Sequence, residues 1–191
     1  MVTQQMHDSK LTIEIKNAIS AIVDSNQYIL GPEVKLFESN FSTYCGTSHC
    51  VAVASGLDAL TLICLAYKEL GVFNDGDEIL VPANTYIATI LSIKRSGLVP
   101  VLIEPDGDYL QMDPTKVEER ISSKTKAICA VHLYGYMTNM APLWDISKKY
   151  HLIILEDAAQ ALGVKFKGKS AGSYGNVSAF SFYADKSLTI G

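Results

Sequence analysis

The strongest candidates for chemistry follow a short apolar run late in the sequence. Residues 152–155 have the pattern of a strand buried on both faces of a parallel sheet, and Glu156, Asp157 and Gln160 come directly after it. Polar groups just beyond the carboxyl ends of buried strands lie where open α/β sheets bind ligands. If a helical turn begins at Asp157, Gln160 shares its face. The competing interpretation is that the carboxylate only caps the next helix.

A second run leads to another candidate pair. Residues 177–182 alternate small and aromatic side chains, which indicates a strand, and they lead to Ser181 and Lys186. A lysine in a site can transfer protons as a general acid–base, typically a contribution of ~10²–10⁴-fold. An isolated lysine is usually solvated. Lys186 is therefore a candidate for catalysis only as part of a set with Asp157, Gln160 and Ser181.

A third candidate is a strand–turn–helix junction. Residues 50–54 predict a short buried strand that runs into Ser55, Gly56 and Leu57, after which the apolar pattern predicts a helix. The first N–H groups of a helix have no intrahelical partner and lie at the positive end of its dipole, so the junction could bind a phosphate. The alternative is that Ser55 simply caps the helix.

The elements that must position these residues alternate along the chain. Strand-like and helical segments follow one another at least five times with short links, which predicts one α/β domain with a mainly parallel sheet and helices on both faces. The expected helices cover about residues 10–24, 32–45, 57–70, 87–94 and 140–150, with another starting at the Asp113-Pro114 pair. The expected strands cover 50–54, 79–82, 98–106, 126–135 (with a loop), 152–155 and 177–182.

Composition excludes several classes of protein. The 191 residues suit one domain with a sizeable core. The formal net charge is −4 and there is no basic tract, so neither nucleic acid nor a membrane is expected as a partner. No apolar run approaches the roughly 20 residues that span a bilayer, and the start lacks a signal-peptide pattern. Four cysteines without CxxC spacing favour a reducing cytoplasm over a disulfide or metal site.

The combination of EDAAQ at 156–160 with SFY–DK at 181–186 resembles the sugar aminotransferases of the DegT/DnrJ/EryC1/StrS family. The resemblance begins near Tyr28, in YILGPEVKLFE, and continues to the end of the chain. The segments VASGLDALTL, VPANTYIAT and VHLYGY are most similar to the branch that aminates C3 of dTDP-3-keto-6-deoxyhexoses. The resemblance implies the large domain of the type I aminotransferase fold and the cofactor pyridoxal 5′-phosphate.

The resemblance also implies catalytic roles for two residues. Lys186 would hold the cofactor aldehyde as a Schiff base and then carry a proton between the substrate and the cofactor. Asp157 would keep the pyridine nitrogen protonated, so that the ring accepts electrons. An adjacent branch of the family, which removes a hydroxyl, has histidine at the lysine position, so Lys186 argues against that branch.

The other implied roles are in cofactor binding. Gln160 matches the family residue that binds the 3-hydroxyl, Ser181 matches one that binds the phosphate, and Tyr86 matches the aromatic residue that stacks on the ring. The turn at Ser55, Gly56 and Leu57 matches the family's phosphate site, although many members have threonine where this chain has Leu57. His132 and Tyr134 could line the pocket, but a satisfied structural histidine is at least as good an interpretation.

The chain stops at Gly191, whereas family members continue for roughly as long again. We therefore interpret residues 1–191 as an incomplete cofactor-binding large domain that lacks the small C-terminal domain. The family resemblance implies a homodimer, glutamate as amino donor and a nucleotide-linked keto-deoxysugar as acceptor, for surface polysaccharide (lipopolysaccharide) or antibiotic sugars.

Three alternatives remain open at this stage. The chain could be a non-catalytic fragment or regulator that retains the fold. It could belong to the 4-amino, perosamine-type branch, because Ser187-Leu188-Thr189 follows the lysine where the 3-amino branch usually has Asn-Leu-Gly. A nicotinamide oxidoreductase is a weaker hypothesis, because no GxGxxG follows any strand.

Overall fold

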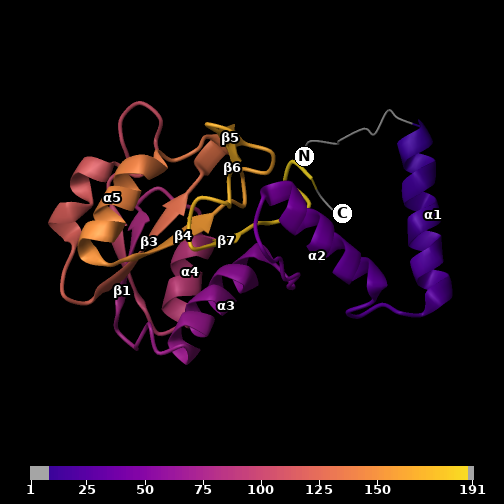
Figure 1. Cartoon of the computed structure of the whole chain (residues 1–191), viewed down its shortest axis with the longest axis horizontal. Coiled ribbons are helices and arrows are strands. Elements are labelled where there is room, and N and C mark those ends of the chain that lie inside the picture. The colour runs from indigo at the N-terminus through magenta and orange to yellow at the C-terminus, as the bar shows by residue number, and fades with distance from the viewer. Residues whose placement is uncertain (1–8, 189–191) are drawn as a thin grey trace.

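The computed structural model describes residues 9–188, and a five-stranded sheet forms its centre (Figure 1). The strand order is β2-β1-β3-β4-β7, and every neighbouring pair in it is parallel. The strands are β1 (Glu78–Pro82), β2 (Val99–Ile103), β3 (Thr125–Val131), β4 (Ile153–Asp157) and β7 (Val177–Ala179). The strands β5 (Lys165–Phe166) and β6 (Lys169–Ser170) form a separate antiparallel hairpin.

The helices join these strands or precede them in the chain. They are α1 (Ser9–Ser25), α2 (Pro32–Cys45), α3 (Gly56–Glu69), α4 (Ile87–Arg95) and α5 (Met140–Tyr150). Three short 3₁₀ turns cover Pro114–Lys116, Glu118–Arg120 and Leu133–Gly135. The expected helices at 87–94 and 140–150 are confirmed, and α3 follows the turn at residue 55 as predicted.

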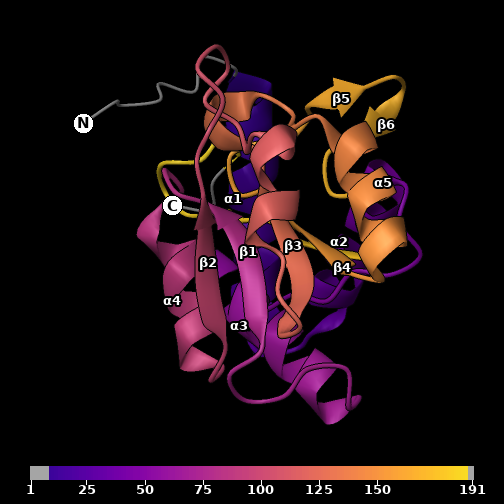
Figure 2. The same ribbon diagram turned by 90° about the vertical axis from the view of Figure 1, so that its left-hand side faces the viewer.

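Both faces of the sheet are covered, as the sequence predicts. Successive side chains of a strand point to opposite faces, so Ile79 packs with Cys64 and Ile93 of α3 and α4, whereas Leu80 packs with Leu143 of α5. Figure 2 shows α4 and α5 on opposite sides of the strands. Each fully buried Leu or Ile contributes ~1.5–3 kcal/mol of transfer free energy. The prediction of a mainly parallel α/β sheet is confirmed.

The prediction of a strand at residues 50–54 is wrong. The segment has no sheet pairing within residues 9–188, and Val51 is 75% exposed. Its backbone is held instead by the side chain of Glu38, whose Oε1 accepts a hydrogen bond from the Ala52 N–H at 2.7 Å. An apolar run becomes a strand only when a neighbour accepts its backbone hydrogen bonds.

Three further expectations on element boundaries need correction. The strand at 98–106 is only Val99–Ile103, and the strand at 177–182 ends at Ala179. The Asp113 carboxylate does cap the following segment, accepting from the Thr115 N–H at 2.9 Å. That segment consists of two 3₁₀ turns rather than the expected α-helix.

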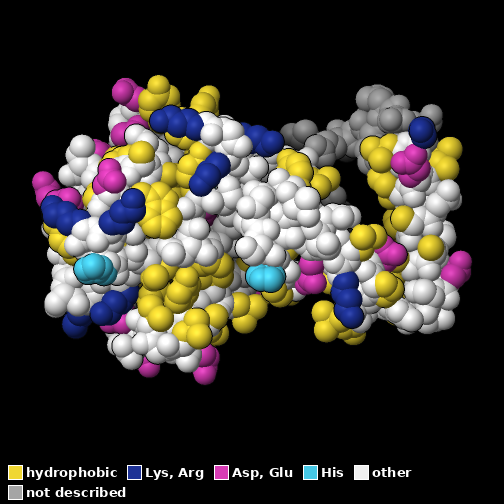
Figure 3. Space-filling model, viewed as in Figure 1, with side chains coloured by type: hydrophobic (Ala, Val, Ile, Leu, Met, Phe, Trp, Pro, Cys, Tyr) yellow, Lys and Arg dark blue, Asp and Glu magenta, His cyan; other side chains and the backbone are white. Residues whose placement is uncertain are grey.

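The first helix forms where its apolar spacing predicts, but it does not pack on the sheet. α1 lies apart from the sheet (Figure 1), and its side chains Ile15, Ile19 and Val23 are 39%, 56% and 54% exposed. Hydrophobic side chains are visible along α1 in Figure 3. Nowhere in residues 9–188 is a helix both long and apolar enough to cross a membrane.

Candidate active site

The carboxyl ends of β4 and β7 lie side by side. Asp157 is in register with Ala179, and the ladder continues past the strand end, where the Ala158 N–H donates to the Ala179 carbonyl at 2.8 Å. The segment after β7 then brings Ser181 and Lys186 to the same edge of the sheet as Asp157. This shared edge is where open α/β sheets bind ligands.

Asp157 is a buried carboxylate with one hydrogen bond to each oxygen. It is 6% exposed, its Oδ2 accepts from the Thr89 hydroxyl at 2.8 Å, and its Oδ1 accepts from the Ala159 N–H at 3.1 Å. Burial raises the pKa of Asp157 above its ordinary value, whereas the Thr89 and Ala159 hydrogen bonds act in the opposite direction. Each carboxylate oxygen accepts one of these bonds and has a further lone-pair site for a ligand.

Lys186 lies close enough for its charge to lower the pKa of Asp157, although its ion-pair partner is Asp185. The Lys186 Nζ is 3.0 Å from Asp185 Oδ1, and the lysine side chain is 20% exposed. Because this pair is formed at the surface, it contributes little stability, about 0–1 kcal/mol, and a ligand can displace it. The lysine is thus accessible from outside the core.

The start of α3 and the segment after β7 meet at Gly56. A side-chain carbon added to Gly56 would lie 3.0 Å from Ser181 Cβ and 3.2 Å from the Phe180 carbonyl oxygen, so glycine permits this close approach. Ser55 caps the helix by accepting from the Asp58 N–H at 3.1 Å, which confirms the capping interpretation. The first-turn N–H groups, Leu57 included, and the Ser181 hydroxyl therefore lie close together, and capping does not preclude an anion there.

Tyr86 and Gln160 lie on the loops around this edge. Tyr86 immediately precedes α4, is 67% exposed, and stands one turn before Thr89. Gln160 lies in a turn and not on the expected helical turn, and its Oε1 accepts from the Tyr134 N–H at 2.7 Å. The roles of Tyr86 and Gln160 toward a cofactor therefore stay predictions.

The sequence did not reveal that Glu156, the carboxylate next to Asp157, has His132 as a buried partner. Glu156, adjacent to Asp157, is fully buried, and its Oε2 lies 2.8 Å from Nε2 of His132. The ring's Nδ1 accepts from the Thr138 N–H at 3.2 Å, so the proton on Nε2 points to Glu156. The interpretation of His132 as a satisfied structural histidine is confirmed.

Glu156 also organises the loop between β6 and β7. Its Oε2 accepts from the Gly172 N–H at 2.9 Å, and its Oε1 accepts from the N–H groups of Tyr174, at 2.7 Å, and Gly175. Burial alone would raise the pKa of Glu156, but the hydrogen bonds from His132, Gly175 and Gly172 outweigh it and hold the pKa below its ordinary value. This ionised carboxylate fixes the loop that leads into β7.

Replacing Gly172 with alanine is expected to destabilise the protein by about 2–5 kcal/mol. Gly172 has φ +84°, and an added Cβ would overlap the Phe180 ring, so backbone strain of about 1–2 kcal/mol adds to overpacking of about 1–3 kcal/mol. Gly168 is a matched control, because it has φ +81° with nothing within 4 Å of an added Cβ. Urea unfolding measures both variants, and equal losses would contradict the steric argument.

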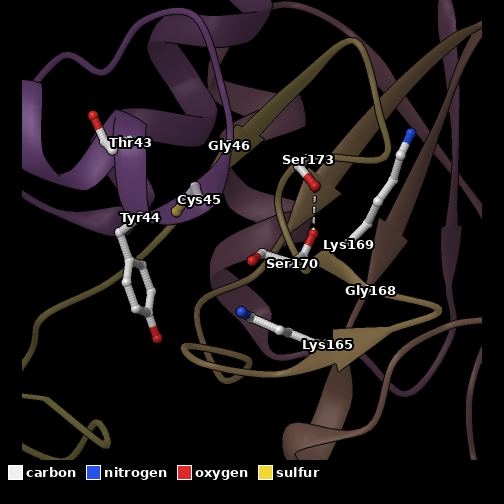
Figure 4. Close-up of a pocket in the computed structure, with 9 residues that line it drawn as sticks. All are labelled: Thr43, Tyr44, Cys45, Gly46, Lys165, Gly168, Lys169, Ser170 and Ser173. Atoms are coloured by element: carbon white, nitrogen blue, oxygen red, sulfur yellow. Dashed lines mark hydrogen bonds between the residues drawn. The ribbon is translucent and has the colours of Figure 1, made fainter.

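An open pocket lies away from this edge of the sheet. It has a volume of about 290 Å³ and lies between the end of α2 and the β5–β6 hairpin (Figure 4). Its lining residues are Thr43, Tyr44, Cys45, Gly46, Lys165, Gly168, Lys169, Ser170 and Ser173. None of the residues that the sequence predicts for the site is among them.

The fold and the edge residues define a class of protein. A parallel sheet that carries a buried carboxylate and an accessible lysine at adjacent strand ends, with a helix start facing a serine, suits a pyridoxal-phosphate enzyme. The donor set fits this cofactor: Asp157 for the pyridine nitrogen, Lys186 for the aldehyde, and the α3 start with Ser181 for the phosphate.

The chain belongs to the DegT/DnrJ/EryC1/StrS aminotransferase family, whose model matches residues 9–191. It is 51% identical over 169 residues to the dTDP-3-amino-3,6-dideoxy-alpha-D-galactopyranose transaminase of Aneurinibacillus thermoaerophilus, covering 88% of this chain and 46% of that protein. It is 40% identical over 155 residues to the GDP-perosamine synthase of Caulobacter vibrioides, covering 81% and 41%.

A solved relative confirms the fold class. The structure of DesV from S. venezuelae, in complex with a ketimine intermediate, has a TM-score of 0.88 and 43% sequence identity, covering 94% of this chain and 47% of DesV. The fold is thus that of the pyridoxal-phosphate aminotransferases. The chain spans about half the length of the curated relatives it matches.

Proposed function

We propose that residues 1–191 form the cofactor-binding domain of a pyridoxal 5′-phosphate-dependent sugar aminotransferase. The enzyme would transfer an amino group from glutamate to C3 of a dTDP-linked 3-keto-6-deoxyhexose. The observation that carries the proposal is the buried Asp157 at the end of β4, with Lys186 of the segment after β7 close enough to act on its charge. The 51% identity to a dTDP-3-amino-3,6-dideoxygalactose transaminase supports the choice of substrate class.

The chain's own residues would hold the cofactor at three points. The start of α3, from Ser55 to Leu57, and the Ser181 hydroxyl would bind the phosphate through N–H and O–H donors. The Asp157 carboxylate would accept a hydrogen bond from the protonated pyridine nitrogen, and Tyr86 would stack on the ring. Gln160 would hydrogen-bond the 3-hydroxyl through its amide nitrogen, while its Oε1 keeps the bond from the Tyr134 N–H.

The bound cofactor supplies an electron sink for the substrate's C–H bond. Lys186 would hold the cofactor until the amino donor displaces it, and its free amine would then carry the proton from the donor's α-carbon to the cofactor. The ion pair with Asp185 would keep the lysine at the mouth of the site between these events.

The finer points of the proposal concern the whole enzyme. We expect a cytoplasmic homodimer that makes amino sugars for a lipopolysaccharide or an antibiotic. The relatives that match are twice the length of this chain, so phosphate and substrate contacts from further segments or a second subunit are compatible with the site.

A second candidate is a 4-amino, perosamine-type aminotransferase. The observation in its favour is that Ser187 and Leu188 follow Lys186 where the 3-amino branch usually has Asn-Leu. The perosamine synthase is the more distant relative, at 40% identity against 51%. The two candidates share the cofactor site and differ in the sugar carbon that receives the nitrogen.

The test of the function is an absorbance spectrum of the purified protein with pyridoxal phosphate. We expect a visible band that L-glutamate discharges, because amino transfer leaves the cofactor as pyridoxamine phosphate. D-glutamate is the matched control and should leave the band in place. A band that persists with L-glutamate would favour the non-catalytic alternative, and the absence of any band would refute the cofactor site.

A further inference from the structure

Two hydroxyl groups connect Asp157 to the start of α4. Thr89, on the first turn of α4, is fully buried, and its Oγ1 lies 2.8 Å from Asp157 Oδ2. Thr85, in the loop before the helix, places its Oγ1 2.8 Å from Thr89 Oγ1. The two threonines and the carboxylate therefore form a continuous chain of hydrogen bonds.

The direction of this chain follows from the number of protons available. An ionised carboxylate only accepts hydrogen bonds, so the Thr89 hydroxyl must donate its single proton to Asp157. The Thr89 oxygen can then only accept in the second bond, which makes the Thr85 hydroxyl the donor. Both dipoles thus point their positive ends toward the carboxylate, an arrangement that favours its charged form.

Neither hydroxyl has the usual role of a threonine near a helix start. A threonine near a helix start commonly caps it or bonds the carbonyl four residues back. Here Tyr86 is the N-cap of α4 and makes no side-chain cap, and the Thr89 hydroxyl bonds to a carboxylate 68 residues away. Burying a hydroxyl without such a bond would cost free energy, so this pairing accounts for its position.

We propose that Thr85 and Thr89 are positioning residues that orient the Asp157 carboxylate and keep it ionised for the cofactor's ring nitrogen. The inference rests on the proposed function, because it assigns a role toward that cofactor. The Ala159 N–H occupies Oδ1 and Thr89 occupies Oδ2, so the carboxylate is held at both oxygens. A fixed, charged acceptor requires no rearrangement when the cofactor binds.

Other titratable groups around Asp157 act in both directions. Lys186 favours its charged form, whereas burial opposes it, and the thiol of Cys129 on β3 and the neutral ring of His132 also lie nearby. Glu156 is the next residue on β4, and its carboxylate is occupied by His132 and the loop before β7. None of these groups is altered by a change at Thr89, so a shift seen in a Thr89 variant reports on the hydroxyl.

The test is the pKa of Asp157 measured by carbon-13 NMR of the side-chain carboxyl, in the protein without cofactor. The resonance is assigned with Asp157→Asn. Thr89→Val removes the hydroxyl at nearly constant volume and is expected to raise the pKa by about one to two pH units, the range for one hydrogen bond to a charged group. Thr89→Ser keeps the hydroxyl and should return the pKa toward the wild-type value.

Two further variants keep the test decisive. Ser92→Ala removes another buried hydroxyl of α4, one that donates to the Thr89 carbonyl at 2.8 Å, and should leave the Asp157 pKa unchanged. Thr85→Val should raise the pKa in the same direction by less, and it replaces Thr89→Val if that variant does not fold. An unchanged pKa in the valine variants, or an equal shift in Ser92→Ala, would overturn the proposal.

A measurement of the affinity for pyridoxal phosphate distinguishes a failure of this proposal from a failure of the proposed function. If the proposed function holds, the valine variant at Thr89 should bind the cofactor about tenfold or more weakly, following the rise of about one pH unit in the Asp157 pKa. If the wild-type protein binds no cofactor, the proposed function fails, yet the NMR shifts still decide whether the hydroxyls control Asp157.

Discussion

Replacing Lys186 with alanine is expected to abolish the visible band formed with pyridoxal phosphate and to lower transamination by the whole enzyme at least ~10³-fold. The reason is that the lysine supplies both the covalent attachment and the proton transfer, and no other amine is expected to take its place. Lys186→Arg should fail equally, because a guanidinium keeps the positive charge near Asp157 but is not deprotonated in proteins.

The matched control for Lys186 is Lys165→Ala. Lys165 is an exposed lysine of the β5–β6 hairpin, and it lines the separate pocket at the end of α2. This variant should keep the band and its response to glutamate. Borohydride reduction of the loaded protein followed by peptide mass spectrometry should place the modified lysine at 186. Modification at another lysine, or a full band in Lys186→Arg, would show that the assignment is wrong.

The meeting of Asp157 with Lys186 and Ser181 could be predicted because it depends only on strand order along an edge. Two apolar runs that both belong to a parallel sheet end at the same edge, and the residues that follow them lie near one another when the strands are neighbours, as β4 and β7 are. In the structure, Asp157 of β4 is in register with Ala179, the last residue of β7. The alternation along β1 similarly placed helices on both faces, since Ile79 and Leu80 are both fully buried.

The segment at residues 50–54 could not be predicted correctly for a physical reason. Its composition, with Val51 and Val53 between small residues, is typical of a strand, but strand formation also requires a neighbouring backbone. Within the described residues its contact is with the Glu38 carboxylate of α2. A local pattern carries no information about whether a pairing partner is present.

The hydroxyl partners of Asp157 escaped the sequence analysis for a related reason. The helical pattern places Thr89 on α4, but which of that helix's polar side chains reaches a carboxylate 68 residues away depends on how the helix crosses the sheet. Glu156 and Asp157 are adjacent and chemically alike, and the strand alternation says only that they point in opposite directions. Tertiary contacts decide that Glu156 supports the loop before β7 and that Asp157 bonds to Thr89.

Glu156→Gln is expected to destabilise the protein by about 3–6 kcal/mol at neutral pH. The carboxylate accepts from the N–H groups of His132 and Gly172 at Oε2 and from those of Tyr174 and Gly175 at Oε1. An amide has one oxygen, so in either orientation its NH₂ group faces two donors, and two hydrogen bonds to a charged group, each about 1.5–3 kcal/mol, are lost. His132 cannot compensate by changing tautomer, because its Nδ1 already accepts from the Thr138 N–H.

The destabilisation by Glu156→Gln is expected to depend on pH. The pKa of Glu156 is held below its ordinary value of 4.5, so its stabilisation is fully present above that value and is lost as pH falls through the folded-state pKa. The pKa of Asp157 is shifted the other way, but Asp157 is present in both proteins, so its contribution cancels in the difference. The destabilisation by Glu156→Gln should therefore shrink below about pH 4.5.

Urea unfolding at a series of pH values measures this difference, and a surface glutamate provides the control. Glu118 pairs with Lys149 at 3.0 Å, but its side chain is 42% exposed, so Glu118→Gln should cost no more than about 1 kcal/mol. A loss from Glu156→Gln as small as that of the control would mean that the loop before β7 does not depend on the buried charge. A large loss that persists undiminished at acid pH would instead assign the effect to packing, because only an ionised carboxylate loses its advantage on protonation.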